Sequence, residues 1–118
     1  RAKLKLSDFE KKVIQALVKG DPDEAIILQQ LAVASVINRD YTGVGVYTNM
    51  VVDKAAPLVR KRDWHLEKIP GVYLNHPNLD DGAGGLLWFE GGKISCLECY
   101  TYVGEWPKDE ELFVIETM

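Results

Sequence analysis

The sequence lacks any apolar run that approaches the ~18–20 residues needed to span a bilayer as a helix. Its basic first residues contain no hydrophobic region of the kind found in signal peptides. No repeat, linker or low-complexity tract divides the 118 residues. We therefore expect one domain over residues 1–118, with residues 1–6 partly disordered or a processing remnant, and no membrane partner.

Positive charge is also scarce, because 14 Lys and Arg residues against 18 Asp and Glu residues give a formal net charge of −4. Proteins that bind nucleic acids usually carry a basic surface that displaces counterions, so we predict no nucleic-acid partner. The one basic cluster, at residues 60–62, is typical of a solvated loop. An acidic balance suits a cytoplasmic protein or one that binds a basic partner.

The motifs of common catalytic and cofactor sites are missing. The chain contains no G-x-S-x-G, no G-x-G-x-x-G and no Walker lysine. The glycine-rich residues 82–85 precede a strand pattern rather than a helix N-terminus, so they do not fit a phosphate-binding loop. We predict no cofactor and leave open whether the protein is an enzyme.

The two cysteines, Cys96 and Cys99, form a C-x-x-C motif within a strand pattern. Three strand residues separate the Cα atoms by about 10 Å, whereas a disulfide needs them within about 7 Å. His65 and His76 do not complete a recognised zinc spacing. We predict two reduced thiols on opposite faces of a strand, no metal site and a reducing, cytoplasmic setting.

Two helices are predicted near the N-terminal end. Ser7 and Glu10 form a capping-box pattern, and apolar residues follow at helical spacing up to a stop at Gly20. An acid and a proline at residues 21–22 begin a second helix, which we predict over residues 25–37. The short connection indicates a helix hairpin.

Strand patterns follow the helices. Period-two alternation predicts a strand over residues 42–52, and shorter strands are expected at residues 72–74 and 112–115. Residues 76–84 have the composition of a loop. Helices followed by strands predict an α+β fold, with the helix hairpin packed on one face of a four- to five-stranded, mainly antiparallel sheet.

The clearest element is a β-hairpin around the two-residue turn at residues 91–92, which suits a primed turn. Continuous pairing from this turn places Phe89 opposite Ile94 and Gly85 opposite Glu98. Both faces of the hairpin are largely apolar, so we expect it to lie centrally in the sheet.

Glu98 is the most unusual residue of this hairpin, because the continuous register places its carboxylate on an apolar face. A carboxylate there is costly unless it is ion-paired or hydrogen-bonded. Arg39, at the end of the predicted second helix, is the best-placed cation. Two interpretations remain open: a structural ion pair of Glu98 with Arg39, and a functional pocket that contains Glu98, Arg39 and Tyr47.

Aromatic residues gather where the chain leaves the sheet. Tyr100, Tyr102 and Trp106 precede or enter a Gly/Pro segment, and we expect them near the surface. Tyr and Trp are enriched at interface hot spots, so these residues are candidates for partner binding. The complete set of candidate binding residues is Glu98, Arg39, Tyr47, Tyr100, Tyr102 and Trp106, with no catalytic residue.

Four further segments are distinctive: residues 39–48 (RDYTGVGVYT), residues 82–89 (GAGGLLWF), residues 97–102 (LECYTY) and residues 106–107 (WP). With the two helices before them, they resemble a group of small bacterial proteins of unassigned function. The resemblance covers most of the chain apart from residues 54–70. It implies a bacterial origin, a cytoplasmic location and the same fold. Similar sequences carry glycine in place of Cys99, which makes the C-x-x-C motif incidental.

The leading functional prediction is a non-enzymatic protein-binding module of immunity or accessory type, with another bacterial protein as its partner. It rests on the acidic charge, the aromatic exit segment and the missing catalytic motifs. The alternative is a small-molecule-binding protein or small enzyme that uses a pocket around Glu98. The sequence leads to no prediction of oligomeric state.

Overall fold

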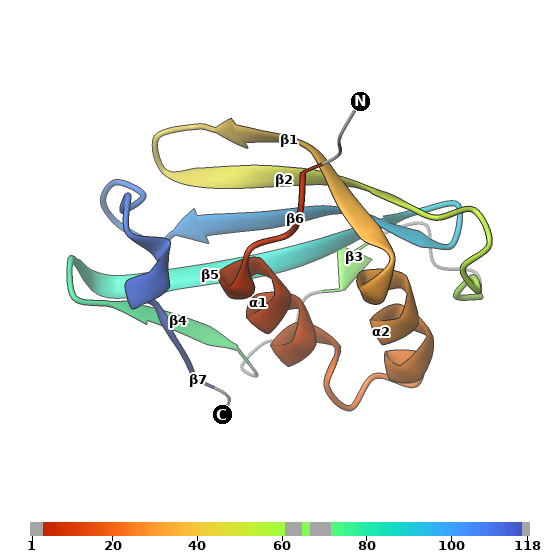
Figure 1. The fold of residues 1–118 in the computed structure, drawn as a ribbon. Coiled ribbons are helices and arrows are strands. Elements are labelled where there is room, and N and C mark those ends of the chain that lie inside the picture. Colours follow the sequence, from red (N-terminus) through yellow and green to blue (C-terminus); the bar gives the residue numbers. More distant parts are fainter. Residues whose placement is uncertain (1–3, 61–64, 67–71, 117–118) are drawn as a thin grey trace.

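The computed structural model describes residues 4–60, 65–66 and 72–116. Two helices, α1 (Asp8–Val18) and α2 (Glu24–Ala32), pack on one face of an antiparallel sheet (Figure 1). The strand order is β1-β2-β6-β5-β4-β7, and the short β3 pairs with β5. The predicted α+β fold is confirmed, with six strands in the main order rather than four or five.

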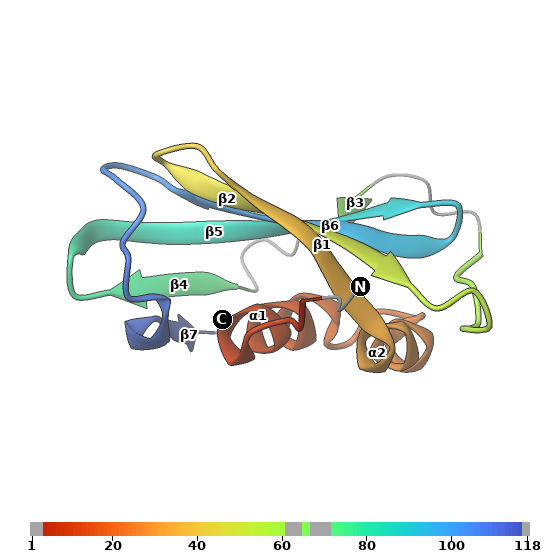
Figure 2. The same cartoon turned by 45° about the horizontal axis from the view of Figure 1, so that its top comes forward.

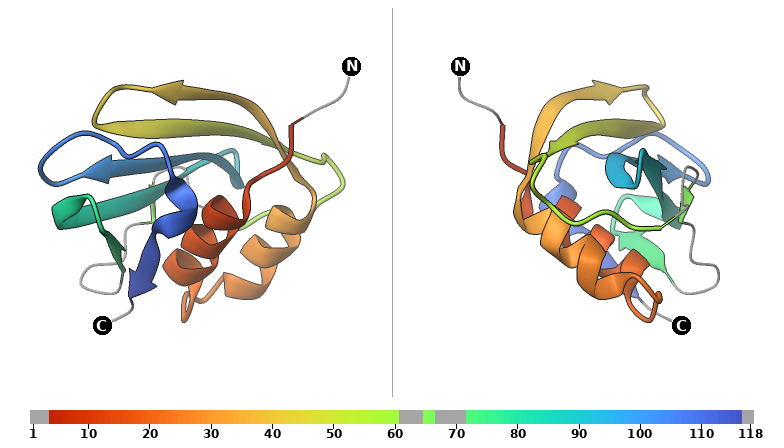
Figure 3. Two further views of the ribbon diagram at one scale, coloured as in Figure 1. Left: turned by 60° about the vertical axis from the view of Figure 1, so that its left-hand side comes forward. Right: turned by 90° about the vertical axis from the view of Figure 1, so that its right-hand side faces the viewer.

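The sheet contains long central strands and shorter outer ones. The strands are β1 (Ala34–Tyr41), β2 (Gly45–Val52), β3 (His65–Leu66), β4 (Tyr73–His76), β5 (Leu79–Glu90), β6 (Lys93–Thr101) and β7 (Val114–Glu116). A 3-10 turn, η1 (Glu110–Leu112), precedes β7 and lies beside α1 together with that strand (Figure 3). Figure 2 shows the helices as one layer against the sheet. No helix in the described part of the chain covers the opposite face, which we call the outer face.

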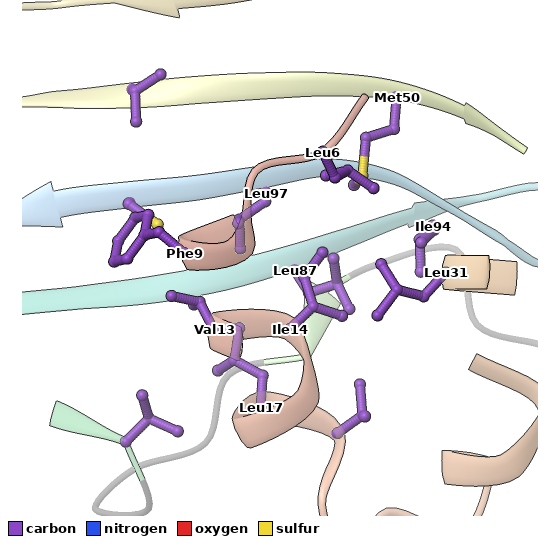
Figure 4. Close-up of a cluster of buried hydrophobic side chains, with 14 of the residues drawn as sticks. Leu6, Phe9, Val13, Ile14, Leu17, Leu31, Met50, Leu87, Ile94 and Leu97 are labelled. Atoms are coloured by element: carbon purple, nitrogen blue, oxygen red, sulfur yellow. The ribbon is translucent and has the colours of Figure 1, made fainter. Parts of the chain in front are cut away.

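Helix α1 begins as its capping box predicts. The Ser7 hydroxyl accepts a hydrogen bond from the Glu10 amide at 3.1 Å, and Glu10 Oε1 accepts one from the Ser7 amide at 2.8 Å. The apolar stripe of the helix then packs against β5, with Val13 and Ile14 fully buried. Figure 4 shows these side chains meeting Leu87 and other apolar residues of the core.

Helix α2 is shorter than predicted. It ends at Ala32, and the Val33 amide closes the last turn by donating to the Gln30 carbonyl at 3.1 Å. The following residues form β1 instead of extra helix, because the β-branched Val36 and Ile37 favour extended backbone and β2 offers a pairing partner. A bridge from Leu4 to Val36 and the burial of Leu6 join residues 4–6 to the fold.

The prediction of a loop at residues 76–84 is wrong. Most of that segment belongs to the β4–β5 hairpin, and its glycines make room for aromatic rings rather than marking a loop. Gly82 has φ +73°, and a Cβ there would lie only 2.5 Å from the Tyr73 ring.

A β-bulge changes the register of the β5–β6 hairpin. Phe89 pairs with Ile94 as predicted, but the pairing then shifts by one residue at Ser95. A one-residue shift transfers every later side chain to the other face of the sheet. The later pairs are Trp88 with Cys96, Leu87 with Leu97, Leu86 with Glu98 and Gly85 with Cys99.

The bulge decides which residues of β6 enter the core. Leu97 and Cys99 are buried against the helices, and Glu98 lies on the outer face. The predicted pairing of Gly85 with Glu98, and the apolar surroundings expected for that carboxylate, are therefore wrong.

Neither of the two helices in the described parts of the chain has the length and apolar character that a membrane-spanning helix needs.

Candidate functional site

Arg39 does not reach Glu98, because it binds Glu10 on the helix-covered face. Its Nε donates to Glu10 Oε2 at 2.7 Å, and its Nη2 donates to Glu10 Oε1 at 2.8 Å. Arg39 lies on β1 opposite Thr48, whose hydroxyl also donates to Glu10 Oε2, at 2.9 Å. The predicted ion pair of Arg39 with Glu98 is wrong, and so is a pocket that contains both of them.

The Glu10 carboxylate is held in its charged form although it is only 2% exposed. Burial by itself raises its pKa, but hydrogen bonds from Arg39, the Ser7 amide and Thr48 outweigh burial and leave the pKa lowered. A carboxylate with donors on both oxygens is stable in the interior. The Glu10–Arg39 pair therefore joins α1 to the sheet and does not form part of an open site.

Glu98 lies on the outer face between two aromatic residues. The indole Nε1 of Trp88 donates to Glu98 Oε1 at 3.0 Å, and Tyr47 is the cross-strand neighbour of Glu98 on β2. The negative charge of Glu98 is the main cause of a raised pKa at Tyr47. Trp88 is 37% exposed and Tyr47 is 38% exposed, so the group is open to solvent.

A second row of residues lies beside this group on the outer face. The cross-strand pairs run from Asn38 on β1 to Asn49 on β2, then to Cys96 on β6 and Trp88 on β5. Asn49 Nδ2 donates to Asn38 Oδ1 at 2.8 Å, which holds both side-chain amides in place. All four residues line an open groove with a volume of about 950 Å³.

The two cysteines are free thiols on opposite faces of β6, as the strand pattern predicts. Burial, with a smaller effect of Glu98, raises the pKa of Cys96 to about 11. Burial also raises the pKa of Cys99, which is 1% exposed, well above its ordinary value. Both thiols are therefore neutral near pH 7, and the described residues contain no group of three metal-ligating side chains.

Tyr100 and Tyr102 lie over the outer face near β4. Their rings meet edge to face with centroids 5.8 Å apart, and Tyr102 stacks on Tyr73 at 6.3 Å. Both hydroxyl oxygens lie within 3 Å of the position that a Cβ of Gly84 would occupy. Glycine at this position therefore lets the tyrosines lie close to the sheet.

Trp106 is buried, which is contrary to the surface position expected for it. Its ring packs against Phe9 and stacks on Phe113 at 5.0 Å. Its Nε1 donates to Glu110 at 2.8 Å, so its polar atom is satisfied. Trp106 therefore fastens the C-terminal segment to α1 and is not available to a partner.

The structure brings together Tyr47 and Glu98 from the predicted set, and it separates both from Arg39 and Trp106. Sequence reasoning missed Trp88 as their neighbour, because only the bulge places it beside Glu98. It also missed the ion pair of Glu10, although the capping box had already marked that residue. Lys61 and Arg62, from the predicted basic cluster, lie outside the described residues.

Comparison of the chain with protein-family models, with curated proteins and with solved structures finds no match in any of the three. A functional assignment therefore has to come from the chemistry of the surface itself.

Proposed function

We propose that the protein is a non-enzymatic protein-binding module that docks its partner on the outer face of the sheet. The observation that carries this proposal is a set of large side chains exposed on that face. Large apolar and aromatic groups on a surface are typical of interaction sites, and Tyr and Trp contribute strongly to binding energy. They are Tyr47, Val51, Trp88 and Tyr102, each at least 37% exposed.

The state of the candidate catalytic groups supports a binding role. Cys96 has a raised pKa and is a poor nucleophile near pH 7. The His76 ring is buried, and both of its nitrogens have partners: Nδ1 accepts from the Asn78 amide at 3.0 Å, and Nε2 lies 3.0 Å from the Asp109 carbonyl oxygen. Arg39 is bound to Glu10.

An immunity or accessory role in a bacterial cytoplasm is the form of this proposal that the acidic charge favours. Free Cys96 and Cys99 support a reducing compartment. The net charge of −4 suits a basic partner.

The groove on the outer face supports a second candidate, the binding of a small molecule. Its volume of about 950 Å³ lies within the ~300–1,000 Å³ typical of ligand pockets. The side-chain amides of Asn38 and Asn49 line the groove and would supply polar contacts to a ligand. We place this candidate second because the groove is open and does not contain Glu98 in its lining.

The test uses the purified protein as bait, with two surface variants. Tyr47→Ser combined with Tyr102→Ser removes two exposed rings from the outer face, and Leu112→Ser removes a 46% exposed side chain from η1 as the matched control. We expect a stoichiometric protein complex with the wild type and with Leu112→Ser, and at least tenfold weaker binding by the tyrosine variant. A partner that binds all three proteins equally would contradict the proposal. A co-purifying small molecule detected by native mass spectrometry, without a protein partner, would favour the second candidate.

A further inference from the structure

A row of cross-strand neighbours on the outer face alternates acids with an aromatic ring. Asp40 on β1 pairs with Tyr47 on β2, and Tyr47 pairs in turn with Glu98 on β6. Tyr47 thus lies between two carboxylates. Asp40 and Tyr47 are exposed and Glu98 is half-buried, so the whole row is accessible from solvent.

Neither acid of this row has a cationic partner. No Lys or Arg in the parts of the chain that the structure describes forms an ion pair with Asp40 or Glu98. Arg39, although it adjoins Asp40 in sequence, points to the other face and binds Glu10. Lys93 lies opposite Glu90 at the turn of the hairpin. The row therefore carries negative charge that no described side chain compensates.

Trp88, on β5 at the other side of β6 from Tyr47, holds the Glu98 carboxylate in place. Its indole N–H occupies one site on Glu98 Oε1 at 3.0 Å. A carboxylate offers about four acceptor sites, so the group can still receive further hydrogen bonds. Because a carboxylate that is already held in place loses less entropy on binding, it is well suited to a charged ligand.

The side chain that fits this arrangement is arginine. Its planar guanidinium stacks on aromatic rings and donates two parallel hydrogen bonds to a carboxylate. A lysine ammonium is a point charge that stacks less well and is more strongly hydrated. An aliphatic or acidic side chain would leave both carboxylates uncompensated.

We propose that Asp40, Tyr47 and Glu98 bind an arginine side chain of the partner protein, with the guanidinium stacked on the Tyr47 ring and hydrogen-bonded to Glu98. This inference rests on the proposed function and adds the chemistry of the partner, which is a basic segment. Charge complementarity supports it, because both the row and the chain as a whole are negative.

The test is a titration with a short peptide of alternating arginine and serine, compared with a peptide in which citrulline replaces arginine. The Trp88 indole N–H signal in a nitrogen-15 NMR spectrum reports binding, since that group contacts Glu98. Low ionic strength limits screening between exposed charges. We expect a saturable shift with the arginine peptide only.

Two variants of equal charge separate a specific site from general attraction. Glu98→Gln keeps an acceptor for the Trp88 indole, and Glu111→Gln changes an exposed acid on η1. We expect Glu98→Gln to weaken the arginine peptide about tenfold, and Glu111→Gln to change its affinity less than twofold. Equal effects of the two variants, or equal binding of the citrulline peptide, would overturn the inference.

The same Glu98→Gln variant separates this inference from the proposed function. If a partner binds Glu98→Gln as tightly as the wild type but binds the Tyr47→Ser and Tyr102→Ser double variant more weakly, the proposed docking face is supported and the proposed arginine site is overturned. A partner that binds every variant equally would contradict the docking face itself.

Discussion

Arg39 and Glu10 form a two-pronged ion pair between β1 and α1, with N···O distances of 2.7 and 2.8 Å. The same carboxylate caps α1 through the Ser7 amide and accepts the Thr48 hydroxyl from β2. One buried acid thus joins a helix to two strands. Because Arg39 binds Glu10, it is not available to Glu98, which the bulge places on the outer face.

Removal of Arg39 is expected to destabilise the protein strongly. Arg39→Ala leaves the Glu10 charge buried without its cation, so the free energy of unfolding should fall by about 2–3 kcal/mol. Urea denaturation measures this change. A double-mutant cycle of Arg39→Ala with Glu10→Gln should show a coupling above about 1 kcal/mol, whereas a cycle with Glu98→Gln should show coupling near zero. The reverse order of coupling energies would contradict the ion pair described here.

Acid should destabilise the fold through Glu10. Because its pKa is lowered in the folded state from an ordinary value of 4.5, Glu10 contributes stability at higher pH, and this contribution is lost as the pH falls below that value. Denaturation curves measured between about pH 3 and pH 6 should show that the free energy of unfolding decreases as the pH falls, and that this decrease is smaller in Glu10→Gln. An unchanged acid decline in that variant would show that other groups cause it.

Glu110 should have the opposite pH dependence. Burial raises its pKa, and the charge of Glu10 adds to this effect. Its ionised form is therefore disfavoured in the folded state, so its contribution to stability should improve as the pH falls through the raised pKa toward 4.5. Glu110→Gln should remove this gain in stability, so the free energy of unfolding should begin to fall at a higher pH than in the wild type. Identical pH profiles for Glu110→Gln and the wild type would contradict the direction of the shift.

Gln30 should be essential to the attachment of α2. Its fully buried amide donates to the Pro57 and Gly92 carbonyls at 2.7 and 2.9 Å and accepts from the Ile94 amide at 3.0 Å. Gln30→Leu would leave these backbone groups unsatisfied and should cost about 2–4 kcal/mol. The exposed Gln29→Leu is the matched control and should change stability by less than about 0.5 kcal/mol. Hydrogen exchange at the Ile94 amide should speed up only in the Gln30 variant.

Both cysteine thiols should react slowly with alkylating reagents, and Cys99 should react more slowly than Cys96. Cys96, with a pKa of about 11, should react with iodoacetamide at pH 8 much more slowly than an unfolded control, and Cys99 should react only on unfolding. Cys99→Ser should cost more stability than Cys96→Ser, because a hydroxyl would enter the core. The double variant Cys96→Ser with Cys99→Ser should bind no less metal than the wild type. Stoichiometric zinc that the double variant loses would contradict the strand geometry.

Local patterns in the sequence were sufficient for several elements. The capping box of Ser7 and Glu10, the alternation in β2 and the turn at residues 91–92 all depend on residues within a few positions of one another. The end of α2 and the strand character of the first part of β5, over residues 79–84, depend instead on distant partners. Val36 becomes a strand residue because β2 pairs with it, and Gly82 is explained by the Tyr73 ring beside it.

The sequence alone determined the α+β class, because its helix and strand periodicities are local properties of the chain. The location of the candidate site was decided by the tertiary structure. A single bulge at Ser95 transfers Glu98 from the core face to the outer face, and the position of a bulge depends on how both faces of the hairpin pack. The partner of Arg39 was decided in the same way, because only the folded chain brings Glu10 within hydrogen-bonding distance of a residue that is 29 positions away.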